Sequence, residues 1–280
     1  MKYIVMKIDE IANRNIIRFR KYFYAIKSIR GLKKIEALFL VPILFTYYKL
    51  ISKNDYRTFR IFERYSGIIN LYGFKFEFRK NTSDVLHVLP YYEPETEKYL
   101  LSRKGKIFID IGAHIGRYSI LLSKNFDKII SIEADPYNYS QLVRNIVLNN
   151  LDNKIIPINV ALSDKIGLIK LYIDDKNEGG NSIIEEKNKY RLVLSFPLDY
   201  IIQILNIDPK DIDLIKIDVE GAEYFVLKGM EKILKEGNSK IVIEIRDNDK
   251  YKDETIKLLS NFGYKIERKL DNINYLFVKY

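Results

Sequence analysis

Hydrophobic positions follow strand and helix periods in turn from about residue 106 to the C-terminus. Short, continuous apolar runs are typical of buried parallel strands, and they alternate with segments in which apolar residues recur every three or four positions. The pattern predicts strands at 106–112, 128–134, 154–163, 167–173, 214–219 and 241–245, and helices at 116–125, 136–150, 222–235 and 250–261. The polar segment 174–188 is expected to be a loop. This alternation predicts an α/β fold with a doubly wound, Rossmann-like sheet.

Two hairpins are predicted outside the alternating units. Residues 68–79 alternate by twos around Gly73, which is typical of two short antiparallel strands. Near the C-terminus, the apolar runs 264–270 and 275–280 are separated only by a short Asp-Asn turn. Strands joined by a tight turn are antiparallel, so the main sheet is expected to close with an antiparallel hairpin at one edge. A short helix is predicted at 96–102.

The N-terminal part of the chain carries the basic excess. Residues 1–80 hold 18 Lys and Arg side chains against 6 Asp and Glu, whereas residues 81–280 hold 29 against 31. Basic residues from Arg14 to Lys34 lead into the apolar run 37–45, which Pro42 interrupts. Even extended to Tyr48, this run is shorter than the roughly 20 residues that span a bilayer. We expect a basic helical extension over residues 1–66 and one main domain over 67–280.

Three roles for the extension remain open. It can bury Leu38–Leu44 against the main domain as a helical cap, or it can bind RNA or a partner through its basic face. A basic stretch beside an apolar one can also lie at a membrane surface, which predicts peripheral membrane contact through residues 14–48. The first ten residues lack the apolar core and cleavage site of a signal peptide, so a cytoplasmic, membrane-peripheral location fits.

Composition excludes several kinds of site. The chain has no Cys, which removes disulfides, thiolate nucleophiles and cysteine metal ligands together. It has two His, His87 and His114, which argues against a histidine-built metal site. No spacing of carboxylates demands a divalent cation either, so no metal is predicted.

The first predicted strand and its loop indicate a nucleoside-binding site. Asp110 ends the strand, and Gly112 and Gly116 allow backbone N–H groups to approach a ligand at the helix start, with tight helix–strand packing as the alternative. Glu133 lies 23 residues beyond Asp110, a spacing that suits an acid accepting hydrogen bonds from a ribose diol. Position 114 is His rather than the second glycine of GxGxxG. Together with the terminal hairpin, this favours S-adenosylmethionine over a nicotinamide dinucleotide.

Several motifs resemble those of the FkbM family of S-adenosylmethionine-dependent methyltransferases. In order and spacing they are Asp110–Gly116, Glu133–Pro136, Val160–Asp164, Lys216–Glu223 and Ile241–Glu244. The resemblance covers residues 100–280 and implies a class I methyltransferase fold, with O-methylation of a hydroxyl on a sugar, glycan or other small molecule. The chain departs from the family at His114, where Asn is usual, and at Arg246, where His is common. The residues that the resemblance implies for the cofactor are Asp110, Gly112, Ala113, His114, Gly116, Glu133, Ala134, Ala161, Leu162, Ser163 and Asp218.

The carboxylates after strand 214–219 are the candidates for chemistry. Methyl transfer is an in-line displacement whose barrier falls when acceptor and methyl group are aligned. A hydroxyl acceptor must also lose its proton, which a carboxylate can take. Asp218 is expected beside the methyl group, and Glu220 is expected to face the substrate as a base or hydrogen-bond acceptor. Glu244 ends the next strand, with a substrate contact and a structural role equally open.

Other polar residues near these motifs each have two interpretations. Asp110 can hold the methionine ammonium or cap the turn, and Asp135 can be a helix N-cap before Pro136. Asp164 can accept the adenine amino group or sit in a plain turn, and His114 can be a base or a packed loop residue. Glu223 is a third candidate for the chemistry, with a simple helix-dipole role as the alternative. Loop 178–182 can close over substrate, and Tyr91, Tyr92 and Glu93 can form a lid or acceptor platform.

Three other functions remain open. The basic N-terminus could guide an RNA methyltransferase, although residues 81–280 supply no basic groove. Glu133 and Asp135 could be the metal-binding pair of a glycosyltransferase. A non-catalytic, membrane-associated binding module is the third. The favoured interpretation is a methyltransferase with a small-molecule or glycan substrate and no nucleic-acid partner.

Overall fold

The chain divides into two compact units. The computed structural model describes residues 20–29, 33–51, 60–90, 92–174 and 180–280. One unit is Met1–Tyr92 and the other is Glu93–Tyr280. The predicted division between residues 66 and 67 assigned the 68–79 hairpin to the main domain, whereas this division groups the hairpin with the N-terminal residues.

The smaller unit combines helices with the predicted hairpin. In order, its described elements are a helix over residues 20–28, α2 (Lys33–Ile51), η1 (Arg60–Arg64), β1 (Gly67–Leu71), β2 (Phe74–Phe78) and α4 (Asp84–His87). The hairpin turns at Tyr72 and Gly73, which both have positive φ, as a two-residue type I′ turn requires. Arg79 donates to both carboxylate oxygens of the buried Asp84 at 2.7 Å, which fastens α4 to the hairpin. Of the predicted extension 1–66, residues 20–28 and 33–51 are helical, and residues 1–19, 30–32 and 52–59 lie outside the described part.

The larger unit is built on a seven-stranded sheet. Its strands are β3 (Gly105–Ile111), β4 (Phe126–Ile132), β5 (Ile155–Ile158), β9 (Ile212–Ile217), β10 (Lys240–Glu244), β11 (Tyr264–Lys269) and β12 (Asn274–Lys279). Their order is β11-β12-β10-β9-β3-β4-β5, and only the pairs that include β12 are antiparallel. Insertion of β12 between β10 and β11 agrees with the class I methyltransferase fold that the sequence resemblance implies. The predicted doubly wound sheet with an antiparallel C-terminal hairpin is confirmed.

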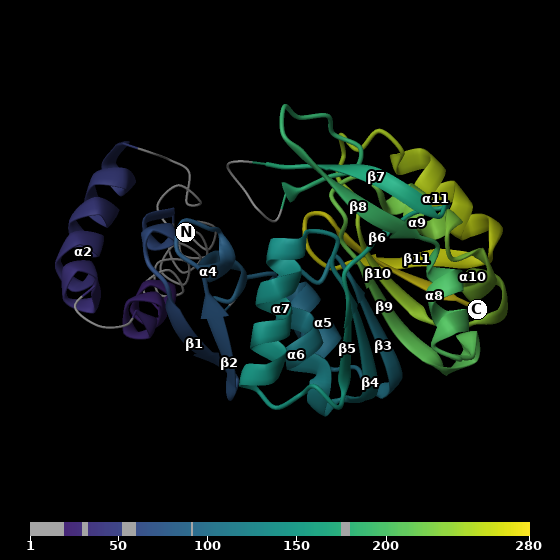
Figure 1. Ribbon diagram of the computed structural model, residues 1–280, viewed down its shortest axis with the longest axis horizontal. Coiled ribbons are helices and arrows are strands. Elements are labelled where there is room, and N and C mark those ends of the chain that lie inside the picture. The colour runs from purple at the N-terminus through teal and green to yellow at the C-terminus, as the bar shows by residue number, and fades with distance from the viewer. Residues whose placement is uncertain (1–19, 30–32, 52–59, 91, 175–179) are drawn as a thin grey trace, which may run out of the picture. The chain divides into compact units, whose positions relative to one another are not determined.

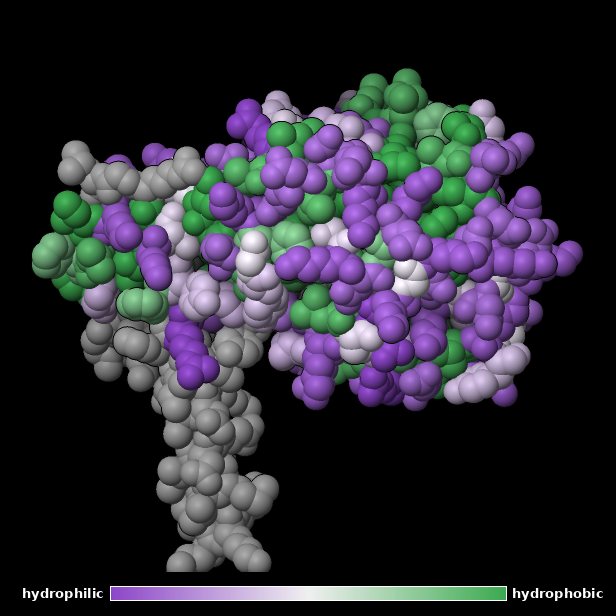
Figure 2. Space-filling model, turned by 90° about the horizontal axis from the view of Figure 1, so that it is seen from below, coloured by the Kyte–Doolittle hydropathy of each residue, from purple (hydrophilic) through white to green (hydrophobic). Residues whose placement is uncertain are grey.

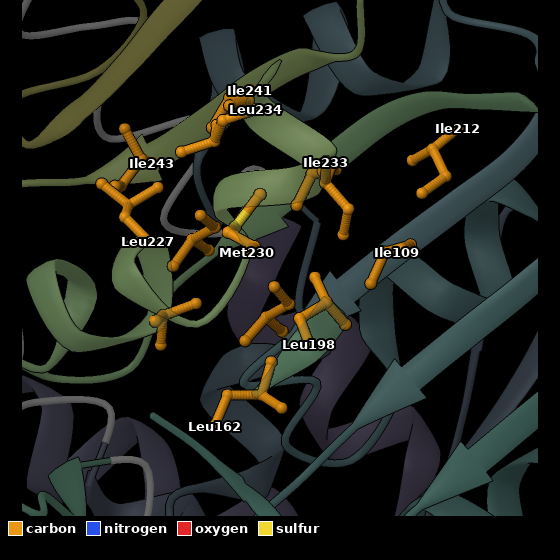
Figure 3. Close-up of a cluster of buried hydrophobic side chains, with 14 of the residues drawn as sticks. Ile109, Leu162, Leu198, Ile212, Leu227, Met230, Ile233, Leu234, Ile241 and Ile243 are labelled. Carbon is orange, nitrogen blue, oxygen red and sulfur yellow. The ribbon is translucent and has the colours of Figure 1, made fainter. Parts of the chain in front are cut away.

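Helices cover both faces of this sheet (Figure 1). On one face are α5 (Pro94–Leu101), α6 (Arg117–Leu121), continued by η2 (Leu122–Lys124), and α7 (Pro136–Leu148). On the other are α8 (Leu198–Ile204), α9 (Glu223–Lys228), α10 (Glu231–Glu236) and α11 (Lys252–Asn261), while η4 (Pro209–Asp211) leads into β9. Figure 3 shows the second of these layers, where Met230, Ile233 and Leu198 meet the strand residues Ile109 and Ile243. Apolar residues on both strand faces account for the continuous apolar runs in the sequence.

A separate three-stranded sheet corrects the predicted strand at 154–163. That segment forms two strands in different sheets, because β5 ends at Ile158 and β6 (Ala161–Leu162) joins β8 (Tyr190–Phe196) and β7 (Gly167–Tyr172). Asn159 marks the break: its side-chain amide donates to the carbonyl oxygens of Glu133 and Ala134 at 2.8 and 3.1 Å. The chain is thereby held at the end of β4 while it changes sheet.

Two further differences from prediction lie between residues 190 and 236. The sequence pattern did not predict β8 or α8. The predicted helix 222–235 is broken into α9 and α10 around Gly229. A Cβ at Gly229 would lie 2.2 Å from the carbonyl oxygen of Ser163, so only glycine lets this helix break pack against the end of β6.

Candidate active site

The loop between β3 and α6 is shaped by close packing of backbone. Gly112 has φ +76°, and a Cβ there would lie 1.8 Å from the carbonyl oxygen of Asp218. The N–H groups of Gly112 and Ala113 donate to the carbonyl oxygen of Ile132, and that of Gly116 donates to Ala113. These amides are used within the protein, so the packing alternative accounts for the two glycines. Their effect is to bring the ends of β3, β4 and β9 together.

Glu133 joins the two loops of the predicted nucleoside site. It is buried at the end of β4, where its Oε2 accepts from the N–H of His114 at 2.8 Å and its Oε1 accepts from the N–H of Asp135 at 2.9 Å. Burial raises its pKa to about 7, against the effect of these two hydrogen bonds. Each carboxylate oxygen has a second lone pair, so Glu133 can still accept from two ribose hydroxyls.

Asp135 is the N-cap of α7, as predicted. Its Oδ1 accepts from the N–H groups of Tyr137 and Asn138 at 2.8 and 3.1 Å. Its Oδ2 accepts from Arg191 at 2.5 Å and from Asn181 at 3.3 Å. Both oxygens therefore already have structural partners, which disfavours a metal-binding pair with Glu133.

Asp110 occupies a buried polar network. Its Oδ2 accepts from the N–H and the hydroxyl of Ser119 at 3.0 and 2.5 Å, and Ser131 donates to the Ser119 hydroxyl at 2.7 Å. Burial raises the pKa of Asp110, while the nearby ammonium of Lys216 opposes that shift. The structure thus gives Asp110 the capping role over the start of α6, and any effect on the methionine ammonium would act through charge or water.

The residues predicted at the adenine edge lie on and after β6. Ala161, Leu162 and Ser163 are all buried. The hydroxyl of Ser163 lies 2.7 Å from that of Ser195 on β8, which ties the strand end into the three-stranded sheet. Asp164 is paired with Lys228 at 2.8 Å. An adenine contact here would therefore use backbone groups or compete with Lys228 for Asp164.

A buried lysine lies at the centre of the predicted catalytic region. Lys216 is on β9 with 3% of its side chain exposed, and its Nζ lies 2.9 Å from Oδ2 of Asp218. The same ammonium is 5.3 Å from the centroid of the Tyr118 ring. Although burial alone would lower the pKa of Lys216, the carboxylates of Asp218, Glu93 and Asp110 raise it above its usual value. Lys216 therefore stays charged and fixes the carboxylate of Asp218.

Glu93 enters the same region from the segment that precedes α5. Its Oε2 accepts from the hydroxyl of Tyr118 at 2.6 Å, and its Oε1 lies 3.4 Å from the amide nitrogen of Asn274. Oxygens of Glu93, Asp218 and Glu244 lie within 4.8 Å of one another. Carboxylates at this spacing can hold a divalent cation, and they equally suit a cationic sulfonium or hydroxyl groups.

Glu220 and Glu244 share one guanidinium. Nη2 of Arg246 lies 2.5 Å from Glu244 and also contacts Glu220. Burial and the nearby Asp218 carboxylate raise the pKa of Glu220 to about 7 and that of Glu244 to about 9, in both cases against the effect of Arg246. Arg246, the residue that departs from the family pattern, thus organises the two acids at the ends of β9 and β10.

Glu223 and Ser182 hold the turn that carries Glu220. Oε1 of Glu223 accepts from the N–H groups of Val219 and Gly221 at 3.2 Å each. The Ser182 hydroxyl donates to the Glu220 carbonyl oxygen at 2.7 Å. Glu220 itself has φ +56°, so these contacts hold it in a conformation that non-glycine residues seldom adopt. Of the predicted closing loop, Glu178 and Gly179 lie outside the described residues, as does Tyr91.

The sequence analysis missed Lys216 as a candidate site residue and included Glu93 only as part of a lid or acceptor platform. Lys216 interrupts an otherwise apolar strand, which is the signal that could have identified it. Glu93 gives no such signal, because it precedes a helix far from the strand ends in sequence. His114 has φ +51° and contributes its backbone N–H to Glu133, consistent with a packed loop residue.

Residues 110–266 match the family model of the methyltransferase FkbM domain, which covers more than half of the chain. The chain belongs to the FkbM methyltransferase family. Among similar proteins, the methyltransferase sdnD of Sordaria araneosa is 27% identical over 191 residues, covering 57% of this chain and 74% of that protein. The hexuronic acid methyltransferase AglP of Haloferax volcanii is 26% identical over 173 residues, covering 62% and 68%.

A solved FkbM methyltransferase from Methylobacillus flagellatus KT is similar to this FkbM protein in fold. The two share 20% identity with a TM-score of 0.47. The match covers 85% of this chain but only 58% of that one, so this chain spans less than two thirds of the solved protein. The family assignment accordingly depends on the match over residues 110–266. The methyl acceptor is inferred from the residues of the candidate active site.

Proposed function

We propose that this FkbM methyltransferase transfers a methyl group from S-adenosylmethionine to a hydroxyl of a sugar, glycan or other small molecule. The observation that carries the proposal is that the C-terminal ends of the parallel strands bring two groups of acidic side chains to one edge of the sheet. One group is suited to bind the ribose and the other to act near the methyl acceptor. Glu133 and Asp218 follow β4 and β9, and Glu244 is the last residue of β10. Ligands of doubly wound sheets bind at this edge, beside the point where strand order reverses. Here that point lies between β3 and β9.

The residues at this edge fit the chemistry of S-adenosylmethionine. Glu133 would accept hydrogen bonds from the ribose hydroxyls, and Gly112 and Gly116 keep the loop beneath it compact. The cofactor supplies an electrophilic methyl group on a positively charged sulfur. Glu93, Asp218, Glu220 and Glu244 outnumber the two cations beside them, Lys216 and Arg246, so a positively charged group placed among these acids would favour their ionised forms. The same carboxylates would repel a pyrophosphate.

The acidic residues would each have a different role in binding and activating the acceptor. Asp218, held by Lys216, is fixed in position to align the hydroxyl. Glu220 has a pKa of about 7, which suits a group that must take a proton near neutral pH. Glu93 and Glu244 offer further oxygens to the several hydroxyl groups of a polyol. A carbohydrate acceptor matches this density of acceptors better than an apolar one.

The first experiment measures S-adenosylmethionine binding by calorimetric titration. We expect Glu133→Ala to weaken binding by about 10- to 100-fold, because a hydrogen bond to a charged group contributes about 1.5–3 kcal/mol. Asp211→Ala is the matched control and should keep wild-type affinity, since Asp211 pairs with Lys106 just before the amino end of β9, at the opposite edge of the sheet. Equal affinity for wild type and Glu133→Ala would remove Glu133 from the ribose site.

The second experiment follows transfer of labelled methyl from S-adenosylmethionine to a panel of neutral sugars, uronic acids and tRNA. We expect alkali-stable label in a sugar, because an ether survives conditions that cleave a methyl ester. Asp218→Asn should keep cofactor affinity within about tenfold while turnover falls by a hundredfold or more. Label in tRNA alone would support the RNA alternative, and unchanged turnover of Asp218→Asn would place the chemistry elsewhere.

A further inference from the structure

Helix α2 of the smaller unit exposes an apolar stripe. Its exposed large hydrophobic residues are Ile35, Leu38, Phe39 and Ile43, with Phe39 72% exposed. Their spacing of three and four residues places them on one side of the helix, while Ala37 and Val41 are buried on the other. In Figure 2, hydrophobic side chains gather at the left end of the view, where Figure 1 places α2. A helix that is apolar on both sides requires a second apolar environment.

The helix over residues 20–28 adds an aromatic and basic surface in the same unit. Arg20, Phe23, Tyr24 and Lys27 are its exposed residues at spacings of three and four. Tyr22 and Ala25 face the interior instead. Aromatic rings beside Lys and Arg are the combination that binds at the boundary between lipid headgroups and acyl chains.

The charge of the N-terminal residues matches an anionic surface. Residues 1–80 carry 12 more basic than acidic side chains, whereas the remaining 200 residues are close to neutral. Each Lys or Arg near an anionic leaflet adds to binding. Nucleic acid would also attract this charge, but it offers no apolar phase for Leu38, Phe39 and Ile43.

The length and shape of α2 define how it can meet a bilayer. It has 19 residues with Pro42 inside it. Within the described part of the chain, no helix has the length and hydropathy needed to cross a membrane. This length suits insertion of the exposed apolar side of α2 into the interface while its other side stays packed against the protein.

We infer that the exposed side of α2, with the neighbouring helix 20–28, docks this methyltransferase onto an anionic lipid surface. The inference is independent of the proposed acceptor and cofactor, because it uses no residue of the larger unit. Membrane attachment would place the enzyme where acceptors carried on lipids are concentrated.

Flotation of the full chain with lipid vesicles tests this inference. Vesicles of phosphatidylcholine are compared with vesicles that contain about 30% phosphatidylglycerol, at about 0.1 and 0.5 M NaCl. We expect binding to the anionic vesicles that weakens at the higher salt concentration. Leu38→Ser with Phe39→Ser should reduce partitioning by at least about tenfold, since each removes a large apolar side chain from the contact.

Two leucines of the larger unit provide the matched control. Leu168 on β7 and Leu192 on β8 are 65% and 62% exposed, so Leu168→Ser with Leu192→Ser removes two exposed large apolar side chains elsewhere. This control should bind vesicles as wild type does. Unchanged circular dichroism and S-adenosylmethionine affinity would show that both variants are folded.

Four results would overturn the inference. In the first, the wild-type protein binds neither kind of vesicle. In the second, the Leu38/Phe39 variant binds vesicles as well as wild type, and in the third the Leu168/Leu192 control loses as much vesicle binding as that variant. In the fourth, the wild-type protein binds RNA but not vesicles. If the wild-type protein is a dimer that does not bind vesicles, and the Leu38/Phe39 variant is a monomer, the surface would be assigned to contact with a second copy of the chain.

Discussion

At the residue scale, the proton affinity of Glu220 depends on two neighbours of opposite charge. Burial and Asp218 raise its pKa to about 7, and the Arg246 guanidinium lowers it. Glu244 competes for the same guanidinium, so the two acids titrate as a coupled pair. Loss of Arg246 would leave both carboxylates without their cation.

This balance predicts a pH dependence of turnover. A general base acts in its deprotonated form, so kcat/KM should rise as pH increases through about 7 and then level off. Arg246→Met should move this limb to higher pH, because the guanidinium that favours the carboxylate is gone. The test is to measure kcat/KM as a function of pH for wild type, Arg246→Met and Glu220→Gln with one acceptor. A limb that persists unchanged in Glu220→Gln would assign the base to another residue, with Glu93 the next candidate.

Sequence spacing predicted that several candidate site residues would lie at one edge of the sheet, and the structure places them there. Asp110, Glu133 and Asp218 each follow an apolar run, and parallel strands deliver their carboxyl ends to one edge. Spacing did not reveal that Asp110 would accept hydrogen bonds from Ser119, because that contact depends on the turn into α6. Glu93 could not be placed, since only tertiary packing brings it to Tyr118 and Asn274.

At the element scale, two departures from prediction come from contacts between segments distant in sequence. Helix 222–235 is interrupted at Gly229, which packs against Ser163, and strand 154–163 is interrupted at Asn159, whose amide donates to the carbonyl oxygens of Glu133 and Ala134. A break imposed by close backbone approach between distant segments leaves no periodic signal. The hairpin 264–280 was predictable because its turn is local.

The turn after β9 yields a stability prediction. Glu223 is buried, and burial raises its pKa from 4.5 to about 7 despite hydrogen bonds from Val219 and Gly221. Between these pH values the folded state binds more protons at this site than the unfolded state does. Its contribution to the free energy of unfolding is therefore complete below about pH 4.5 and falls as pH rises to about 7.

Glu223→Gln keeps an oxygen for the two N–H groups and removes the titration. The Tm of the variant relative to wild type should increase from pH 5 to pH 8, as followed by thermal denaturation. Glu231→Gln in the first turn of α10 is the control for loss of one acidic charge and should leave the difference flat. A constant difference between Glu223→Gln and wild type across this range would contradict the raised pKa.

At the scale of the whole molecule, the division into two units separates the effects of ligand and lipid. All residues assigned to the cofactor belong to Glu93–Tyr280, whereas the proposed lipid contact belongs to Met1–Tyr92. A ligand that binds only the native state stabilises it by about 2.7 kcal/mol when present at about 100 times its Kd. That stabilisation extends to every part of the chain that unfolds cooperatively with the cofactor site.

Hydrogen exchange measured with S-adenosylmethionine can therefore locate the cofactor site and test the independence of the units. We expect slower exchange in 110–119 and 131–138, where Asp110, Glu133 and their loops lie, and no change in β1 and β2 of the smaller unit. The same measurement with anionic vesicles should slow exchange in residues 33–51 instead. Because stability is local as well as global, protection by the cofactor that extended equally over residues 67–78 would show that the two units unfold as one. The larger unit would then be incomplete without the smaller one, and lipid binding would be coupled to cofactor affinity by thermodynamic reciprocity.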